Sequence, residues 1–271
     1  VIFVGHSSEY NLDKTYTKEK KFKFIEIDNS IKIKYKDVKL NFSDNKKIID
    51  IYVKGNNPRV IFFESELKDK TINFINNFKN SKQLTNTNID INGLTGCITV
   101  YDSKVSNLSL NSKNAICEDA INIINSVGHI RKVEINNSIS DSLDLDFSRL
   151  AIENLNILNS KNDCLDVSSG EYKIDYIYAR NCSDKSISIG EGSNATINNA
   201  NLDSSNTLIA VKDGSKLDLN NLVSENNEFE TCIDVYRKKQ EFSGSFVNYR
   251  KITKNCKKKI KKDKFSVIQN I

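Results

Sequence analysis

Short triplets, in which one polar or small residue stands between two branched apolar residues, recur along the chain at a nearly constant step. The successive steps between their central residues are 23, 22, 22, 22, 22 and 24 residues. The central residues are Thr99, Asn122, Asp144, Asp166, Ser188, Ala210 and Asp234. Alternation with a period of two predicts strands that point their apolar flanks inward and their centres outward. A regular step of this length predicts a solenoid.

A second apolar series lies between these triplets and keeps the same step. It includes Val133-Glu134-Ile135, Leu155-Asn156-Ile157 and Ile177-Tyr178-Ala179. Each repeat therefore carries at least two strands, joined by corners rich in Asn, Ser, Asp and Gly. A strand-helix-strand unit needs roughly 30 residues, and the fixed leucines of leucine-rich repeats are missing. The pattern predicts an all-β parallel β-helix of about 22 residues per coil, with asparagines at corners that need left-handed backbone angles.

The regular pattern covers residues 93–250 and divides the chain into three parts. Residues 1–92 alternate strongly but irregularly, as in Phe22–Ile27, which predicts early β coils with a cap or a separate β-domain. The stretch 70–79 has a helix-like pattern and is expected to be a short cap or a loop. Residues 251–271 are strongly basic and are expected to be a solvated end, with an anionic polymer partner as the alternative.

Composition narrows the classes of protein further. Apolar residues make up 38% of the 271 residues and charged residues 28%, which excludes a disordered chain. No apolar run approaches the roughly 20 residues of a membrane span. The formal net charge of +5 does not by itself indicate a nucleic-acid partner. Methionine is absent, which we interpret as a mature or trimmed chain without its signal peptide.

Alignment of the repeats predicts an acidic patch on one face of the solenoid. Equivalent residues of neighbouring coils lie about 4.8 Å apart in a parallel stack. The column three positions before the triplet centres contains three aspartates followed by Lys185, and the column two positions after the centres contains Lys212 and Tyr236. The acids of the patch are Asp119, Asp141, Asp144, Asp163 and Asp166.

Carboxylates stacked at this spacing repel one another unless they share protons, hold a cation or face a lysine. We expect Lys185 to keep neighbouring acids ionised and to have a raised pKa itself. Ca²⁺ is a candidate cofactor because it takes several oxygen ligands in a flexible geometry. A solvated ladder without a function is the alternative.

Four stretches of the patch resemble the motifs of the polygalacturonases, which are right-handed parallel β-helices of the pectin-lyase-like superfamily. The stretches run over roughly residues 138–215 and keep the order of the family's motifs, N-T-D, D-D-C, G-H-G-x-S-I-G and R-I-K. They are Ser140-Asp141-Ser142, Asn162-Asp163-Cys164, Asp184-Lys185-Ser186-Ile187-Ser188-Ile189-Gly190 and Val211-Lys212. A broader likeness over residues 93–242 is to poorly characterised bacterial right-handed β-helix proteins, and it implies the fold and little about activity.

The resemblance implies roles for individual residues and also shows departures from the family. Asp141 and Asp163 fall on acids of the first and second motifs, and Lys212 matches the substrate-binding lysine. Asn162 stands where the family has its proton donor, Lys185 replaces the histidine and Ala210 replaces the arginine. Inverting hydrolysis needs one protonated carboxyl and one that activates water, and Asn162 does not supply that proton.

The residues that remain support three reactions on an acidic polysaccharide, namely hydrolysis, β-elimination and epimerisation. We assign catalysis to Asp141, Asp163 and Lys185, the lysine acting as a charge stabiliser or acid. We assign substrate binding to Asp119, Asp144, Asp166, Lys212, Tyr236, Arg237 and Lys238, with an exposed basic corner as the alternative for the last three. His6 and His129 have no ligand-spaced partner and are expected to be structural or surface residues, and no metal-ligand motif is present.

The cysteines form three sequence-neighbour pairs, Cys97 with Cys117, Cys164 with Cys182 and Cys232 with Cys256. Their separations of 20, 18 and 24 residues are each close to one coil, so each pair can form a disulfide between neighbouring coils. Cys164 and Cys182 also match a bridge common in the polygalacturonases. Bridged cysteines predict a secreted, periplasmic or cell-surface protein, and reduced cysteines predict a cytosolic one.

Two functional hypotheses follow. The first is a secreted or periplasmic β-helix that acts on an acidic polysaccharide. The second is a non-catalytic β-helix for carbohydrate binding, adhesion or surface assembly. The missing family residues favour the second hypothesis, and the cluster of Asp141, Asp163, Lys185 and Lys212 favours the first.

Overall fold

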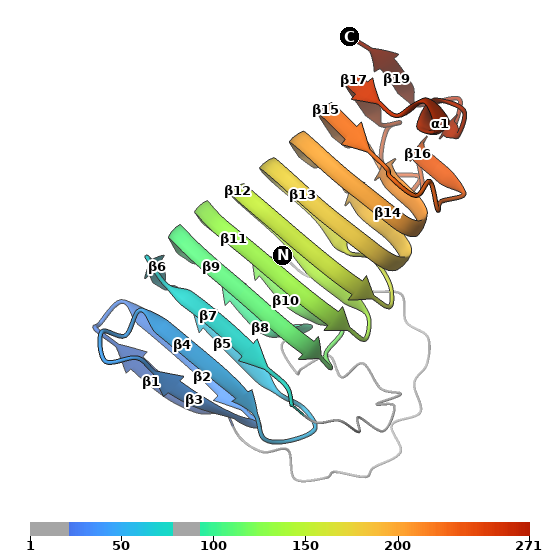
Figure 1. Cartoon of the computed structure of the whole chain (residues 1–271). Helices are drawn as coiled ribbons and strands as arrows, with labels where there is room; N and C mark the ends of the chain where they lie inside the picture. The colour runs from blue at the N-terminus through green and yellow to red at the C-terminus, as the bar shows by residue number, and fades with distance from the viewer. Residues whose placement is uncertain (1–21, 78–92) are drawn as a thin grey trace, which may run out of the picture.

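The chain folds as a parallel β-solenoid of about nine turns, with about 23 residues per turn. Figure 1 shows the coils stacked in one direction from the N-terminal to the C-terminal part of the chain. The structure is a computed structural model that describes residues 22–77 and 93–271; His6 lies outside these residues. The predicted fold class is confirmed, and the observed turn is about one residue longer than the predicted one.

The repeated triplets lie on one face of the solenoid, which we call the first face. Its strands pair in parallel with Asp119 opposite Asp141, Asp144 opposite Asp166 and Ile187 opposite Ile209, as the alignment predicts. The first face consists of β5 (Arg59–Phe63), β8 (Gly96–Tyr101), β10 (Asp119–Ile124), the first strand segments of β12 (Asp141–Ser160) and β13 (Leu165–Gly190), the last segments of β13 and β14 (Asn194–Lys212), β16 (Thr231–Tyr236) and β18 (Ile260–Lys262).

Two further faces complete each coil. The second face contains β6 (Glu66–Lys68), the first halves of β9 (Lys104–Ala115), β11 (Val127–Ser138) and β15 (Lys216–Val223), residues 149–152, 171–174 and 194–197, most of β17 (Phe246–Ile252), and β19 (Val267–Asn270). The third face contains β7 (Thr71–Ile75), the second halves of β9, β11 and β15, and residues 154–158, 176–180 and 199–203. The predicted second apolar series belongs to this third face.

The core is a narrow column of branched side chains between the three faces. Ile121, Leu143, Leu165, Ile187 and Ile209 follow one another along it, each with 0% exposure. Burial of one such side chain contributes roughly 1.5–3 kcal/mol. Because every coil adds the same inward positions, the core lengthens with the solenoid without becoming thicker.

The corners use left-handed backbone angles, as the asparagine content predicts. Asn114, Asn137, Asn159 and Asn181 occupy equivalent corners with φ of 57–65°. Their amides form a ladder in which Nδ2 of Asn137, Asn159 and Asn181 donates to Oδ1 of the asparagine in the preceding coil, at 2.8 to 3.0 Å. Asn therefore stabilises these corners in two ways: its backbone tolerates the left-handed angles, and its side chain bonds to the neighbouring coil.

Phe147 occupies a left-handed corner between the first and second faces. Its φ is 50°, and the neighbouring corners hold Asn125 and Ser169 at similar angles. Bulky side chains are strained in this region, whereas Asn tolerates it. We expect Phe147→Asn to raise the free energy of unfolding by about 1 kcal/mol, measured by urea unfolding beside Asn125→Ala, which should lower it. A loss of stability in Phe147→Asn would mean that contacts of the ring outweigh the backbone strain.

The N-terminal part covers the first coils with antiparallel strands. These are β1 (Lys23–Ile27), β2 (Ile31–Lys36), β3 (Val38–Phe42) and β4 (Ile48–Val53), where β1 pairs with β2, β2 with β5 and β3 with β4. Parallel stacking begins where β4 pairs with β7 and β5 with β8. The helix-like prediction for residues 70–79 is wrong over β7, where Ile72 and Phe74 point into the core as alternate residues of a strand.

The basic C-terminal segment forms a further coil at the solvated end of the solenoid. A short helix, α1 (Lys254–Lys257), is followed by β18 and β19, which pair in parallel with β16 and β17. Residue 251 itself lies inside β17. The lysines of this segment are therefore carried by a folded coil.

Three disulfides connect neighbouring coils. They join Cys97 to Cys117, Cys164 to Cys182 and Cys232 to Cys256, with Cα–Cα distances of 5.3, 5.5 and 5.2 Å. All three predicted pairs are confirmed, because the repeat length places each pair at one corner of adjacent coils.

Candidate functional site

The predicted acidic patch lies on the first face and spans three consecutive coils. Asp119, Asp141 and Asp163 follow one another in one column, and Asp144 and Asp166 lie in the column beside it. Asp119 and Asp163 are buried, whereas Asp141, Asp144 and Asp166 are half-buried. We call these five residues and Asp146 the acid cluster.

Aspartates of the first column bind the backbone of the next coil. Asp141 Oδ1 accepts a hydrogen bond from the Asp163 amide at 2.7 Å, and Asp163 Oδ1 accepts one from the Lys185 amide at 2.9 Å. Each of these carboxyl groups satisfies a polar backbone group that burial would otherwise leave unpaired. Their other oxygen, Oδ2, is the atom that can carry a proton.

Lys185 ends the acidic column, as the sequence predicts. Its ammonium lies 3.5 Å from Asp163 Oδ1 and forms a close ion pair with Asp184. Burial opposes the charge of Lys185, but the hydrogen bond to Asp184 and the charge of Asp163 together raise its pKa. Lys185 is therefore a cation that stabilises negative charge, and it is not poised to take a proton.

Sequence reasoning missed Asn122 and Asp146 as members of the site. The Asn122 amide donates to Oδ2 of Asp144 and to Oδ2 of Asp146, at 3.1 Å in each case. Burial raises the pKa of Asp146, and its interactions with Asn122 and Asp144 offset part of this effect. The alternation along the strand could have identified Asp146, because a period of two places Asp144 and Asp146 on the same side of one strand.

Burial is the main cause of the raised pKa values of five acids in the cluster. It raises the pKa of Asp119 to about 8, that of Asp163 to about 7 and those of Asp141 and Asp146 to about 6. It also raises the pKa of Asp144 well above its usual range, and the charge of Asp119 adds to this effect. The expectation that Lys185 keeps its neighbours ionised is wrong for Asp163, because burial outweighs the lysine's charge.

Several polar atoms near the cluster are buried without a hydrogen-bond partner among the described residues. They are Asp119 Oδ2, Asn122 Oδ1, Thr99 Oγ1 and Ser188 Oγ. Thr99, Asn122 and Ser188 belong to the outward column of triplet centres, yet none is more than 1% exposed. A buried polar atom without a hydrogen-bond partner lowers the stability of the fold. Stability alone therefore does not explain why polar residues occupy these positions of the first face.

The predicted substrate-binding residues beyond the acids divide into two groups. The Lys212 side chain lies across Gly190, where a Cβ would be 2.8 Å from Lys212 Cε, and so points toward the coils that carry the acids. Tyr236 is half-buried and close enough to Lys185 for their charges to interact. Arg237 instead packs on the ring of Phe265 at 3.8 Å, and Lys238 follows it at a corner bound through its amide to Asp213.

A metal centre is not apparent in the part of the chain that the structure describes. Within residues 22–77 and 93–271, no group of three or more His, Cys, Asp or Glu side chains is arranged to hold a metal ion. Instead, Asp141 and Asp163 accept hydrogen bonds from backbone amides, and Asp144 and Asp146 accept hydrogen bonds from Asn122. The raised pKa values of Asp119, Asp141, Asp146 and Asp163 offer another relief of the repulsion between these acids, because a protonated carboxyl group carries no charge.

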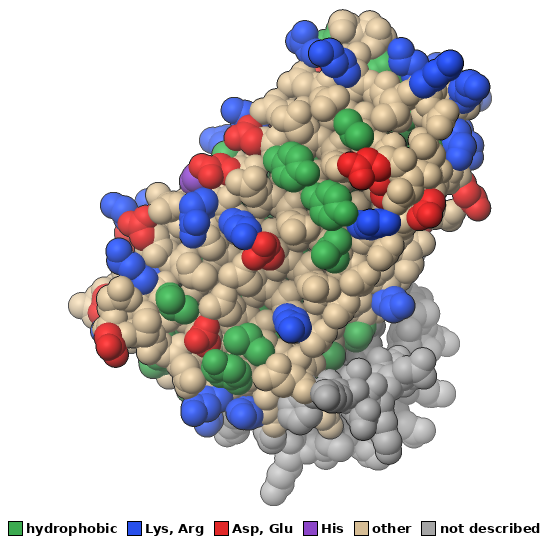
Figure 2. All heavy atoms as spheres, viewed as in Figure 1, with side chains coloured by type: hydrophobic (Ala, Val, Ile, Leu, Met, Phe, Trp, Pro, Cys, Tyr) green, Lys and Arg blue, Asp and Glu red, His purple; other side chains and the backbone are tan. Residues whose placement is uncertain are grey.

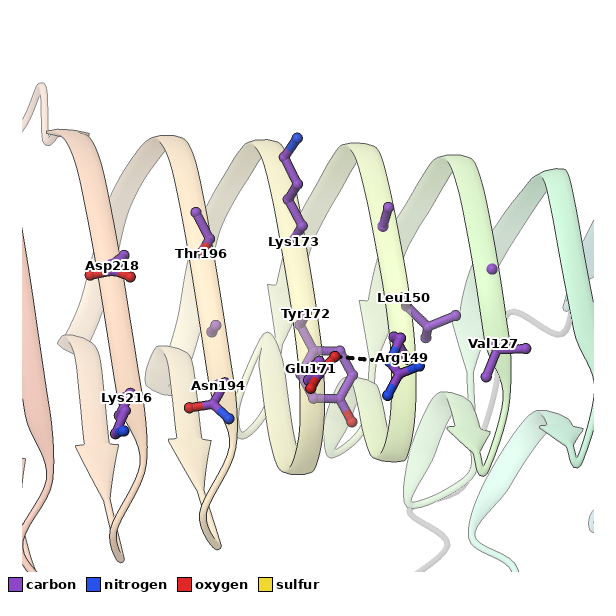
Figure 3. Close-up of a pocket in the computed structure, with 13 residues that line it drawn as sticks. Val127, Arg149, Leu150, Glu171, Tyr172, Lys173, Asn194, Thr196, Lys216 and Asp218 are labelled. Carbon is purple, nitrogen blue, oxygen red and sulfur yellow. Dashed lines mark hydrogen bonds and ion pairs between the residues drawn. The ribbon is translucent and has the colours of Figure 1, made fainter.

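A pronounced groove lies on the second face, away from the acid cluster. It has a volume of about 590 Å³ and crosses β11 to β15, with Leu150, Ala151 and Ala195 among the residues that line it. Figure 3 shows Arg149 and Glu171 paired beside it, with Nε and Oε2 2.8 Å apart, and Lys173 extended away from them. None of the residues that line this groove belongs to the acid cluster.

The remaining predictions concern His129 and the membrane. His129 lies on the second face, half exposed, with Nε2 2.9 Å from Glu153 Oε1, and so is a surface residue. No helix in the described residues is long and apolar enough to cross a membrane.

Comparisons with known proteins give no match among protein-family models, curated proteins or solved structures. The likeness to polygalacturonases therefore rests on the four short motifs alone.

Proposed function

We propose that this protein is an extracytoplasmic enzyme that hydrolyses an acidic polysaccharide on the first face of the solenoid. The observation that carries the proposal is the acid cluster, in which six aspartates lie on three adjacent coils and Asp163 lies 3.5 Å from the cation of Lys185. The three disulfides support an extracytoplasmic location, because disulfides persist in oxidising compartments.

Hydrolysis is favoured over the other two reactions by the protonation of the site. Glycoside hydrolysis needs a carboxyl group that is still protonated near neutral pH and a second one that is ionised. Asp163, with a pKa of about 7, suits the acid, and Asp141, with a pKa of about 6, suits the base. β-Elimination and epimerisation need a base that removes a carbon-bound proton, and the raised pKa of Lys185 makes it a poor one.

An acidic substrate fits the cations and the protonated acids of this face. Lys185 and Lys212 offer positive charge to a uronate carboxylate. Protonated carboxyl groups of the cluster can donate hydrogen bonds to the same carboxylate. The first face therefore offers an anionic sugar both donors and charge.

The test is a screen on uronate-containing polymers that reads reducing ends, the absorbance of unsaturated products and epimer ratios by NMR. We expect reducing ends, with a rate that declines as the pH rises through about 7 because Asp163 then loses its proton. Asp163→Asn should lower the rate by roughly 10²–10⁴-fold. The asparagine Oδ1 can still accept the Lys185 amide, so this variant should fold.

Two further variants complete this test. Lys185→Ala should also lower the rate, whereas Asp175→Asn, an exposed position outside the cluster, should leave it unchanged. A rate that survives both Asp163→Asn and Lys185→Ala would refute the proposed site. Unsaturated products would show that the enzyme acts by elimination and not by hydrolysis.

A non-catalytic module for carbohydrate binding or surface assembly is the second candidate. Asp213 Oδ1 accepts the backbone amides of Lys238 and Lys239 at a corner, much as Asp141 and Asp163 accept amides on the first face. By this comparison, the aspartates of the first column would hold the backbone of the next coil and would take no part in catalysis. Binding of a uronate polymer without turnover, unchanged in Asp163→Asn, would favour this candidate.

A further inference from the structure

The third face carries two tyrosines that neither the core nor the acid cluster uses. Tyr176 and Tyr178 are alternate residues of β13 and point outward on either side of the buried Ile177. Tyr176 is 41% exposed, and Tyr178 is half-buried. Exposed aromatic rings at alternate strand positions form a surface that is apolar on the ring face and polar at the hydroxyl.

Asparagines flank each tyrosine from the coil before and from the coil after. Asn154 and Asn199 lie opposite Tyr176, and both are exposed. Asn156 and Asn201 lie opposite Tyr178 in the same way. None of these six positions carries a charge, in contrast to the first face.

The two tyrosines and the four asparagines opposite them form a patch, and a groove on the same face leads up to it. It has a volume of about 410 Å³ and crosses β7, β9, β11 and β12. Asn156 belongs both to the groove and to the patch. Figure 2 shows the third face toward the viewer, with green side chains, the colour that includes tyrosine, grouped near its middle. Four asparagines line the groove, Asn73, Asn111, Asn136 and Asn156, and its two charged residues are of opposite sign, Lys113 and Glu134.

From this arrangement we infer a second binding site, for an uncharged polysaccharide chain that lies along the third face. A sugar ring presents hydroxyl groups that both donate and accept hydrogen bonds, and an asparagine amide does the same. The apolar C–H face of the ring matches the face of a tyrosine. The groove and the patch together extend over several coils, which fits a chain better than a single sugar.

This site is independent of the proposed hydrolysis, because it lies on another face and uses no acid of the cluster. Its role is to hold the protein on a neutral glycan. The aromatic and amide side chains supply the contacts, and the solenoid holds them at fixed spacing.

The test is affinity electrophoresis of the whole protein in native gels that contain a β-glucan, a mannan, a xylan or a dextran. Polygalacturonate and alginate serve as charged counterparts. We expect at least one neutral polymer to retard the protein. Tyr176→Ala/Tyr178→Ala should weaken the retardation at least about fivefold, because both ring contacts are lost.

Three controls keep the test decisive. Tyr101→Ala removes an equally exposed tyrosine from the first face and should bind like the wild type. Tyr176→Phe/Tyr178→Phe keeps the rings and should retain most of the binding, which separates stacking from misfolding. Asp163→Asn should bind neutral polymer normally even where it abolishes hydrolysis. The inference is overturned if no neutral polymer retards the wild type, or if the double alanine variant binds unchanged.

Discussion

Reduction of the three disulfides is expected to destabilise the protein by about 3 kcal/mol for each bridge. Each bridge closes a loop of 18 to 24 residues and ties one coil to the next. In a solenoid each coil contacts only its neighbours, so loss of a bridge weakens the stack locally. Because all six cysteines are no more than 2% exposed, reductant should act slowly on the folded protein and quickly in urea.

Urea unfolding of oxidised and reduced protein measures this effect. The midpoint should fall strongly on reduction, and Cys164→Ala/Cys182→Ala should account for about 3 kcal/mol of the loss. Mass spectrometry without reductant should find no free thiols. Six free thiols in the untreated protein would contradict the bridges and, with them, the extracytoplasmic location.

The second large effect is a loss of stability as the pH rises. Four acids of the cluster, Asp119, Asp141, Asp146 and Asp163, have folded pKa values of about 6 to about 8, above the ordinary aspartate value of 3.8. Between these limits the folded protein holds protons that the unfolded chain has released, so stability falls with increasing pH. The stabilising contribution is complete below about pH 4 and is lost once the pH passes about 8. For one carboxyl group, a folded pKa that lies one pH unit above the unfolded pKa corresponds to about 1.4 kcal/mol, so these four acids together contribute on the order of several kcal/mol.

Thermal unfolding at constant ionic strength, at pH 5 and at pH 8.5, measures this dependence. The melting temperature should be higher at pH 5. Asp119→Asn removes the most buried acid of the column and should reduce the difference, whereas Asp44→Asn, at an exposed position of the N-terminal cap, should not. Stability that rises from pH 5 to pH 8.5 would mean that the folded acids are ionised, as a bound cation would make them.

The repeat made much of this structure predictable. A period of two fixes which side chains face inward, and a constant step fixes which residues become neighbours. The pairing of Asp119 with Asp141 and of Cys164 with Cys182 follows from these two facts. The antiparallel pairing of the N-terminal strands and the strand at Thr71–Ile75 did not follow, because this part of the chain has no repeat to align.

The sequence by itself therefore determined the parallel solenoid, its register, the disulfide pairs and the column of acids that ends at Lys185. Only the tertiary structure decided how these acids are protonated, because the pKa of Asp163 depends on how completely its coil is buried. It also decided that Arg237 packs on Phe265, that the 590 Å³ groove lies on the second face, and that asparagines surround Tyr176. Register is a property of spacing along the chain, whereas burial and side-chain direction depend on every neighbour in space.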